Sequence, residues 1–293
     1  MLAPIALKVA IIGARGCIGG AAAAALQARD VGVIRCSSKP AAGESLYVDL
    51  ANEKSWKNLP RQLDAVLICA GSGNLRECLL KPDQTAAVNV TGTAGLVNRL
   101  HQSRVFTVVL STNYVFDASR PDFAPQDRVS PLCEYGRQKV RMERAIAPSL
   151  SDGFAAVVRL TKVLGGQNKL LKSWLSRLQQ HQKVEAANDA RSAFLPSQFV
   201  GESLASIVMS KAAGFWHLSA TDDFSWLDVA TAACDMLGAS RELVVGRRLI
   251  DLDHEIEFVP KHGTLALAWP DRIEPPSSML AVRGALESMC RHI

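Results

Sequence analysis

The chain has 293 residues, enough for one large domain or two modest ones, and its 48% hydrophobic and 21% charged content is typical of a folded globular protein. The net charge of +5 is scattered, without a Lys/Arg run of the kind found in nucleic-acid-binding tails, although a basic surface favours an anionic small ligand. No apolar run approaches the ~18 residues that a bilayer span requires, so we expect no membrane association.

Strand-like and helix-like segments alternate through the first half of the chain. Met1–Ile12 is apolar and enters a glycine-rich loop without a cleavage-like site, so we interpret it as containing a first strand and not as a signal peptide. The elements predicted here are, in order, strand Lys8–Ile12, helix Gly20–Arg29, strands Val31–Cys36 and Asp64–Ala70, helix Gln84–Gln102, and strands Val105–Leu110 and Ala155–Leu160. This βαβ alternation with unbroken apolar strands predicts an α/β fold, a doubly wound parallel sheet with helices on both faces.

The alternation stops after Leu160. The elements predicted there are helices Leu170–Gln180, Val200–Ala213 and Asp228–Leu237, and the short strand Gly214–Ser219. We therefore expect a Rossmann domain over residues 1–160 and a smaller, mainly substrate-binding lobe over residues 161–293. Part of that second segment, about residues 195–235, is expected to return to the first domain.

The loop between the first strand and the first helix has glycines at 13, 16 and 19. Gly13 would allow the tight turn, Gly16 a close approach of the backbone to a pyrophosphate, and Gly19 close packing of helix on strand. With the helix N-terminus facing the phosphates, this loop predicts dinucleotide binding. The loop residues expected at the cofactor are Gly13, Arg15, Gly16, Cys17, Ile18 and Gly19.

The end of the second predicted strand indicates which dinucleotide is bound. An acidic residue there would bind the ribose 2′-hydroxyl of NAD, whereas cations accept the 2′-phosphate of NADP. The segment Arg35-Cys36-Ser37-Ser38-Lys39 contains no acid, so we expect NADP(H) in preference to NAD(H). Arg35, Ser37 and Ser38 would lie near the phosphate, Arg15 would assist, and Asp49-Leu50 would meet the adenine edge.

Tyr135 and Lys139 are spaced i,i+4, so on a helix both side chains lie on one face. An ammonium close to a phenol favours the phenolate, so we expect a lowered pKa of Tyr135 and proton transfer near neutral pH. Ser111 and Thr112 directly follow the predicted strand Val105–Leu110, where parallel sheets bind ligands. Their hydroxyls are expected to hydrogen-bond the same carbonyl group as the tyrosine.

The serial order of these motifs resembles the extended short-chain dehydrogenases/reductases, in particular the dTDP-4-dehydrorhamnose reductases within the NAD-dependent epimerase/dehydratase family. The residues that carry the resemblance are the glycine loop, Val48-Asp49-Leu50, Cys69-Ala70-Gly71, Asn89-Val90-Thr91-Gly92-Thr93, Ser111 to Asp117, Tyr135-Gly136-x-x-Lys139, Arg159 to Gly165 and Gly214 to Ser219. The resemblance implies an NADPH-dependent reductase of a keto group, with an anionic sugar nucleotide as substrate.

The resemblance also implies roles for single residues. Tyr135 would donate the proton, Lys139 would tune it and bind the nicotinamide ribose, and Thr112 with Ser111 would orient the carbonyl. Ala70, Gly71 and Asn89 would complete the cofactor site. The residues expected near the sugar nucleotide are Asn168, Trp174 and Asn188 to Ser197.

Other functions stay open at this point. A 4,6-dehydratase is disfavoured, because Asn113 and Tyr114 stand where that activity needs an acidic pair. Two alternative functions remain: an epimerase of the same superfamily, and a non-catalytic NADP-binding regulatory subunit such as the β subunit of methionine adenosyltransferase. Assembly as a homodimer is also possible for the reductase. Seven cysteines without C-x-x-C spacing and six histidines without ligand-like spacing predict no metal site and a cytoplasmic location.

Overall fold

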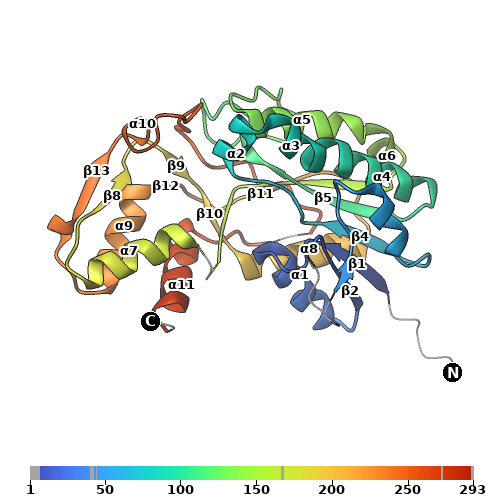
Figure 1. Cartoon of the computed structure of the whole chain (residues 1–293), viewed down its shortest axis with the longest axis horizontal. Helices are drawn as coiled ribbons and strands as arrows, with labels where there is room; N and C mark the ends of the chain where they lie inside the picture. Colours follow the sequence, from blue (N-terminus) through green and yellow to red (C-terminus); the bar gives the residue numbers. More distant parts are fainter. Residues whose placement is uncertain (1–6, 40–42, 44, 166–167, 272, 292–293) are drawn as a thin grey trace.

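A computed structural model of the chain describes residues 7–39, 43, 45–165, 168–271 and 273–291, so residues 1–6 of the apolar N-terminal segment lie outside the described part. The central element is a seven-stranded parallel sheet, which confirms the predicted fold class (Figure 1). Its strands are β1 (Lys8–Ile12), β2 (Gly32–Ser37), β3 (Leu46–Tyr47), β4 (Ala65–Ile68), β5 (Phe106–Thr112), β6 (Ala155–Leu160) and β11 (Gly214–Leu218).

The order of the strands places a crevice at the carboxyl ends of the central strands β1 and β4. The order is β11-β6-β5-β4-β1-β2-β3, with all neighbours parallel. The chain winds outward from β1 to β3 and then returns to β4 on the other side of β1. At such a reversal the loops that leave the two strands diverge, and ligands bind in the crevice outside the carboxyl ends.

Alternate residues of the buried strands pack on opposite faces of the sheet. Val9 and Ile11 join one apolar cluster with α1 (Cys17–Gln27) and α8 (Ser197–Ser210), whereas Ala10 and Ile12 join another on the far face. The second face is covered by helices from the segment between β4 and β6 (Figure 1). These helices are α2 (Leu75–Leu80), α3 (Pro82–Ala86), the π-helix η2 (Ala87–Gly92), α4 (Thr93–Gln102), α5 (Glu134–Ala145) and α6 (Ala147–Ser151).

Small residues bring α1 and α8 together beneath the sheet. A Cβ on Gly201 would lie 2.5 Å from the carbonyl carbon of Ala21, so only glycine fits at this crossing. The alanine-rich sequence of α1 therefore serves more than helix propensity, because its short side chains allow the close approach.

Two predicted helices have different limits in the structure. The first helix begins at Cys17 and not at Gly20, because Gly16 already stands at the N-cap position. The predicted helix Gln84–Gln102 is divided by the π-helix η2, in which the Thr93 hydroxyl donates to the carbonyl of Val88 at 2.8 Å. Gly92 fits there because a Cβ would lie 2.1 Å from the carbonyl oxygen of Leu50. Single π turns inside helices often occur at functional sites.

Most of the remaining elements form a smaller lobe with its own apolar cluster (Figure 1). Its elements are β7 (Lys162–Leu164), α7 (Lys169–Gln179), β8 (Val184–Ala187), β9 (Arg191–Ser192), β10 (Phe194–Pro196), β12 (Phe224–Ser225), α9 (Trp226–Met236), η4 (Arg241–Leu243), β13 (Val244–Arg247), α10 (Leu249–Leu252) and α11 (Ser278–Cys290). Two short 3-10 helices, η1 (Glu53–Asn58) and η3 (Asn113–Val115), belong to the part around the central sheet. The lobe core joins α7, α9 and α11. No helix of the described residues is long and apolar enough to cross a membrane.

The predicted domain limits stay a proposal, including the return of about residues 195–235 to the Rossmann domain. Within that segment, α8 and β11 pack with the central sheet. Helix α9 packs instead in the lobe, where Val229, Ala230 and Ala233 join its apolar core. The division of the chain at residue 160 stays a proposal.

Candidate active site

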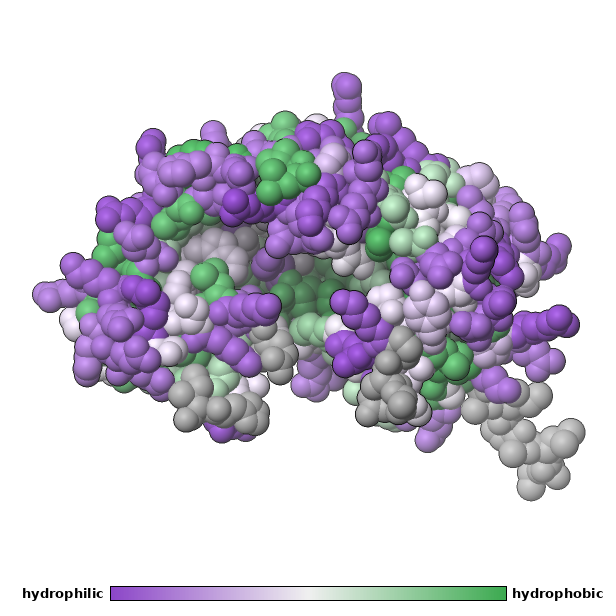
Figure 2. Space-filling model, viewed as in Figure 1, coloured by the Kyte–Doolittle hydropathy of each residue, from purple (hydrophilic) through white to green (hydrophobic). Residues whose placement is uncertain are grey.

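A cleft of about 280 Å³ lies at the carboxyl ends of the sheet strands. Figure 2 shows a hollow at the centre of this face, with apolar residues at its base and polar residues around its rim. The cleft is lined by Ile18 of α1, by the residues that follow β4, by the ends of β5 and β6, by the first turns of α5 and by β7. It therefore joins the glycine loop, the predicted catalytic residues and the smaller lobe in one space.

The glycine loop has the geometry that the sequence predicts. Gly13 has a φ of +86°, and a Cβ on it would lie 2.7 Å from the backbone nitrogen of Ala70. A Cβ on Gly19 would lie 2.3 Å from the carbonyl oxygen of Gly13, so α1 packs directly on the loop. Gly16 caps α1 without a side-chain hydrogen bond, and the first turn contains no acid. The N-terminal N–H groups of α1 are thus available to an anion, and the loop fits a dinucleotide pyrophosphate.

The cations predicted to select the cofactor lie at the end of β2 and in the loop. Arg35 donates to Gln27 Oε1 at 3.1 Å, and Arg15 donates to the carbonyl of Lys39 at 2.6 Å. Neither guanidinium forms an ion pair with an acid among the described residues. Ser37 accepts from Lys39 N at 3.1 Å, and the neighbouring Ser38 is exposed. These side chains leave positive charge free for a phosphate.

Asp49 and Leu50 lie in the turn that follows β3. The Asp49 carboxylate accepts from Ala51 N at 2.9 Å, and Leu50 is buried against the π-helix. The aspartate therefore fixes its own turn and remains partly exposed. A contact of this turn with adenine stays a prediction.

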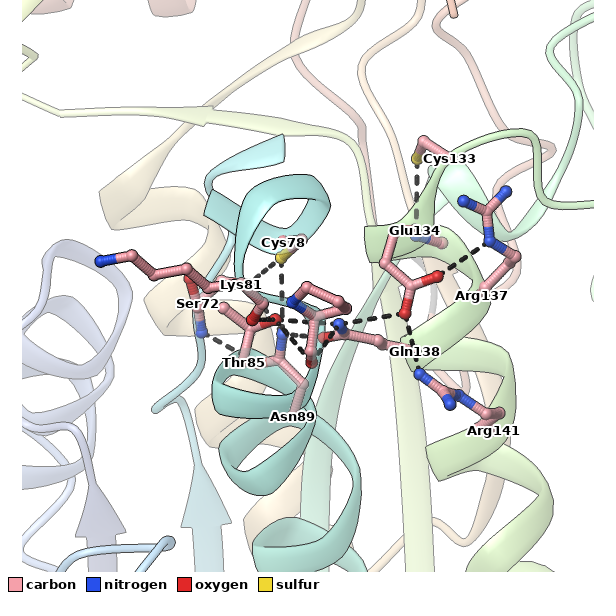
Figure 3. A network of polar contacts seen from close by, with 12 residues as sticks. Ser72, Cys78, Lys81, Thr85, Asn89, Cys133, Glu134, Arg137, Gln138 and Arg141 are labelled. Atoms are coloured by element: carbon pink, nitrogen blue, oxygen red, sulfur yellow. Dashed lines mark hydrogen bonds and ion pairs between the residues drawn. The ribbon is translucent and has the colours of Figure 1, made fainter. Parts of the chain in front are cut away.

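Asn89 is fully buried, and its amide is used within the protein (Figure 3). Its Oδ1 accepts from Ser72 N, and its Nδ2 donates to Ser72 O and to Gln138 Oε1, each at 2.9 Å. Gln138 in turn donates to Thr85 Oγ1 at 2.9 Å. These contacts let Asn89 position its neighbours, and its predicted contact with the cofactor stays a prediction. The asparagine fixes the segment that begins at Gly71, where a Cβ would lie 3.1 Å from Asn89 Oδ1.

Tyr135 and Lys139 lie on the face of α5 that borders the cleft, as their spacing predicts. Gly136 allows this placement, because a Cβ there would lie 2.1 Å from the carbonyl oxygen of Tyr114. The Lys139 ammonium donates to the carbonyl of Leu110 at 3.0 Å and lies 5.9 Å from the centre of the Tyr135 ring. Thr112, at the end of β5, lines the same cleft.

The expected lowering of the Tyr135 pKa is wrong. Burial raises the pKa of Tyr135 above its usual value, with a further contribution from Cys78, and the hydrogen bond with Thr112 only partly opposes it. Burial also lowers the pKa of Lys139 to about 8, although the charge of Glu143 acts in the other direction. The tyrosine is therefore a protonated phenol at neutral pH, a state that suits a proton donor and not a base.

Ser111 and Thr112 differ in their contacts within the protein. Adjacent residues of a strand point to opposite faces, and β5 continues through Thr112. The Ser111 hydroxyl donates to Glu143 Oε1 at 2.5 Å, and the same carboxylate accepts from Arg159 at 3.0 and 2.8 Å. Ser111 therefore belongs to a buried ionic cluster with Glu143 and Arg159, although it also lines the cleft, and its predicted hydrogen bond to a carbonyl substrate stays a prediction.

Two residues predicted to lie near the sugar nucleotide make contacts within the smaller lobe. Asn168 caps α7 by accepting from Leu171 N at 3.1 Å, and Trp174 is buried in the lobe core. Of the segment Asn188 to Ser197, Ser192 lines the cleft, whereas Phe194 and Leu195 are fully buried.

Two cleft residues received no role from the sequence. Tyr114 follows Thr112, and its ring centre lies 6.4 Å from that of Tyr135 in an edge-on arrangement. Lys162 lies on β7 and lines the same cleft. A cation just after a buried strand that ends at the cleft was the available signal for Lys162.

The RmlD substrate binding domain family model matches residues 7–254. A dTDP-4-dehydrorhamnose reductase of Mycolicibacterium smegmatis is 25% identical over 82% of this chain and 72% of its own. The β subunit of methionine adenosyltransferase 2 from Rattus norvegicus is 27% identical over 57% of this chain, and the match spans 50% of that protein's length. The chain thus spans about half the length of this curated relative.

Solved structures support the fold. The dTDP-4-dehydrorhamnose reductase of Bacillus anthracis, solved in complex with NADP, superposes with a TM-score of 0.83 over 97% of this chain and 99% of that one. The sequence identity is 16%, so this likeness concerns the fold alone. The UDP-glucose 4-epimerase of Thermus thermophilus, in complex with NAD, gives a TM-score of 0.79 at 15% identity over 98% of this chain and 100% of that one.

Proposed function

The chain belongs to the RmlD substrate-binding domain family, and on this premise we propose that it is an NADPH-dependent reductase of a keto group on a nucleotide-linked deoxysugar. The observation that carries the proposal is Tyr135, a half-buried and protonated phenol beside Thr112 at the carboxyl edge of a parallel sheet. A relative named dTDP-4-keto-6-deoxy-D-glucose reductase, from Streptomyces niveus, is 28% identical over 59% of this chain and 61% of its own length.

Three residues of the chain, Tyr135, Thr112 and Lys139, have separate roles in the proposed reduction. When bound, NADPH supplies the hydride. The Tyr135 hydroxyl donates its proton to the alkoxide oxygen as that oxygen forms. The Thr112 hydroxyl hydrogen-bonds the same oxygen and stabilises its charge, a contribution of order a few kcal/mol for one well-placed donor. Lys139, held by the carbonyl of Leu110 at 3.0 Å, places a positive charge beside the reacting group.

The pH dependence follows from the two shifted groups. Since the pKa of Lys139 is about 8, the ammonium loses its charge as the pH rises through that value. Tyr135 keeps its proton over the same range, because its pKa is raised. We expect the kcat for keto reduction to be level near neutral pH and to fall above about pH 8. Initial rates over a pH series would check this, and a kcat that rises with pH through neutrality would show that a phenolate is required.

Cofactor choice gives a further prediction. A phosphate contact with arginine is charge-assisted, so we expect NADPH to bind more tightly than NADH, with a preference that weakens as salt rises. Arg35→Ala should reduce the NADPH preference by roughly ten- to a hundredfold, the range of a hydrogen bond to a charged group, and should affect NADH much less. Calorimetric titration with both cofactors measures this.

The control for this experiment is Arg99→Ala, which removes an exposed arginine from α4, outside the residues that form the glycine loop and the end of β2. It should leave both affinities unchanged. Equal or tighter NADH binding by the unmodified protein would refute the NADP assignment.

A stoichiometric assay separates this proposal from its alternatives. With a dTDP-4-keto-6-deoxysugar, a reductase consumes one NADPH for each product molecule, whereas an epimerase forms product without net oxidation. The similarity to methionine adenosyltransferase β subunits favours a non-catalytic subunit as the second candidate. That candidate gains support if the protein binds NADPH, reduces none of the keto sugars and co-purifies with an adenosyltransferase.

A further inference from the structure

Lys162 is a cation on the wall of the cleft. It lies on β7, where its backbone nitrogen donates to the carbonyl of Ala193 at 2.9 Å. Its ammonium lies 5.9 Å from the centre of the Trp226 ring and forms no hydrogen bond or ion pair within the described part of the chain. The side chain is exposed to the cleft, which also contains Tyr135 and Thr112.

The acids close in sequence to Trp226 are already engaged elsewhere. Asp228 accepts from Ser225 in the capping box of α9. Asp223 pairs with Arg191 at 2.6 Å through one carboxylate oxygen, and its other oxygen accepts from Gly263 N at 2.7 Å. These carboxylates stabilise local structure and leave the Lys162 charge uncompensated.

Lys162 is exposed at the cleft, and the neighbouring protein partly desolvates its ammonium and lowers its pKa. An anion that enters the cleft would meet this charge without competition from a paired carboxylate among the described residues. The adjacent Thr161 is buried on the cleft wall, and its hydroxyl has no hydrogen-bond partner in the described residues. Lys162 and Thr161 therefore both offer hydrogen-bond donors to a ligand in the cleft.

We propose that Lys162 binds an anionic group carried by the substrate itself, in the same cleft as the reacting carbonyl. The proposal rests on the reductase function proposed above and defines its substrate class more narrowly, as a keto compound that bears an oxyanion within reach of β7. Two sources have this chemistry: the pyrophosphate that links a sugar to its nucleoside, and a carboxylate on the sugar ring.

Binding to the complex of the full chain with NADP⁺ tests this assignment without turnover. The probes are dTDP-glucose, UDP-glucose and UDP-glucuronic acid, each titrated by calorimetry. Lys162→Met removes the charge but keeps an unbranched side chain, and Lys162→Arg restores the charge. Lys183→Met is the matched control, since Lys183 is exposed in the loop between α7 and β8 and does not line the cleft.

Lys162→Met should weaken binding by roughly ten- to a hundredfold, as expected for a charge-assisted hydrogen bond. Lys162→Arg should recover part of the affinity, and Lys183→Met should match the unmodified protein. A loss for all three probes identifies the pyrophosphate, whereas a loss for UDP-glucuronic acid alone identifies the carboxylate.

Equal affinities for the unmodified protein and Lys162→Met, or no binding of any probe to the unmodified protein, would overturn the assignment. This failure is distinguishable from failure of the reductase proposal. A protein that oxidises NADPH but binds the probes independently of Lys162 refutes only the present inference. A protein with Lys162-dependent binding and no reduction of any keto sugar refutes only the reductase proposal.

Discussion

Replacing Tyr135 by phenylalanine is expected to lower kcat for keto reduction by roughly 10²- to 10⁴-fold, the usual contribution of a positioned proton donor. The substitution removes only the hydroxyl and keeps the aromatic ring that lines the cleft, so the cleft keeps its shape. NADPH affinity should stay nearly unchanged, because the glycine loop and Arg35 belong to other elements. Stopped-flow or steady-state rates, together with calorimetric binding of NADPH, measure the two effects separately.

Tyr114→Phe is the matched control. Tyr114 lines the same cleft, and burial raises its pKa to about 12, so its environment resembles that of Tyr135. It lies on η3 and not on the helix face of Lys139, and it should therefore lose far less activity. Full activity of Tyr135→Phe, or equal losses in both variants, would remove Tyr135 from the proposed role.

The second large effect is expected on stability. Glu143 and Arg159 form a buried ion pair at 2.8 Å with side chains 5% and 4% exposed, and Ser111 donates to the same carboxylate. Glu143→Ala leaves the Arg159 charge buried without its partner, and such a loss typically costs about 3–5 kcal/mol of unfolding free energy. Urea denaturation should show a lower midpoint with an unchanged slope.

The double variant Glu143→Leu/Arg159→Met provides the comparison for this prediction. Replacing both charges by apolar groups removes the desolvation cost together with the attraction, so the double variant should be more stable than Glu143→Ala. A Glu143→Ala variant with unchanged stability would indicate that water or another group compensates Arg159. A double variant less stable than Glu143→Ala would show that packing around the pair, and not its charge, dominates.

Local patterns in the sequence were sufficient for the sheet and for the cofactor loop. Residues 9–12 of the strand Lys8–Ile12 are all apolar, as a strand buried on both faces requires. The glycines that follow it are needed for close packing, because a Cβ on Gly13 or Gly19 would collide with neighbouring backbone. The i,i+4 spacing of Tyr135 and Lys139 likewise fixed their common helix face. These features depend on neighbours in the chain, which the sequence shows directly.

The features that the sequence did not reveal depend on distant contacts. The period of a strand could have separated Ser111 from Thr112, but the partner of Ser111 lies 32 residues away on α5. The raised pKa of Tyr135 results from burial, which the spacing of Tyr135 and Lys139 does not contain. The π-helix around Asn89 and the packing of α9 against α7 depend equally on the assembled fold.

Transfer of deuterium to the substrate from NADPH that carries deuterium in both positions at C4 tests the central proposal most directly. The keto sugar and the labelled cofactor are incubated with the protein, and the product is examined by mass spectrometry and NMR. We expect one deuterium for each product molecule, bound to the carbon that carried the carbonyl, and almost none with Tyr135→Phe over the same time. A product without deuterium, or an unchanged keto sugar in the presence of bound NADPH, would contradict a reductase that transfers hydride from this cofactor.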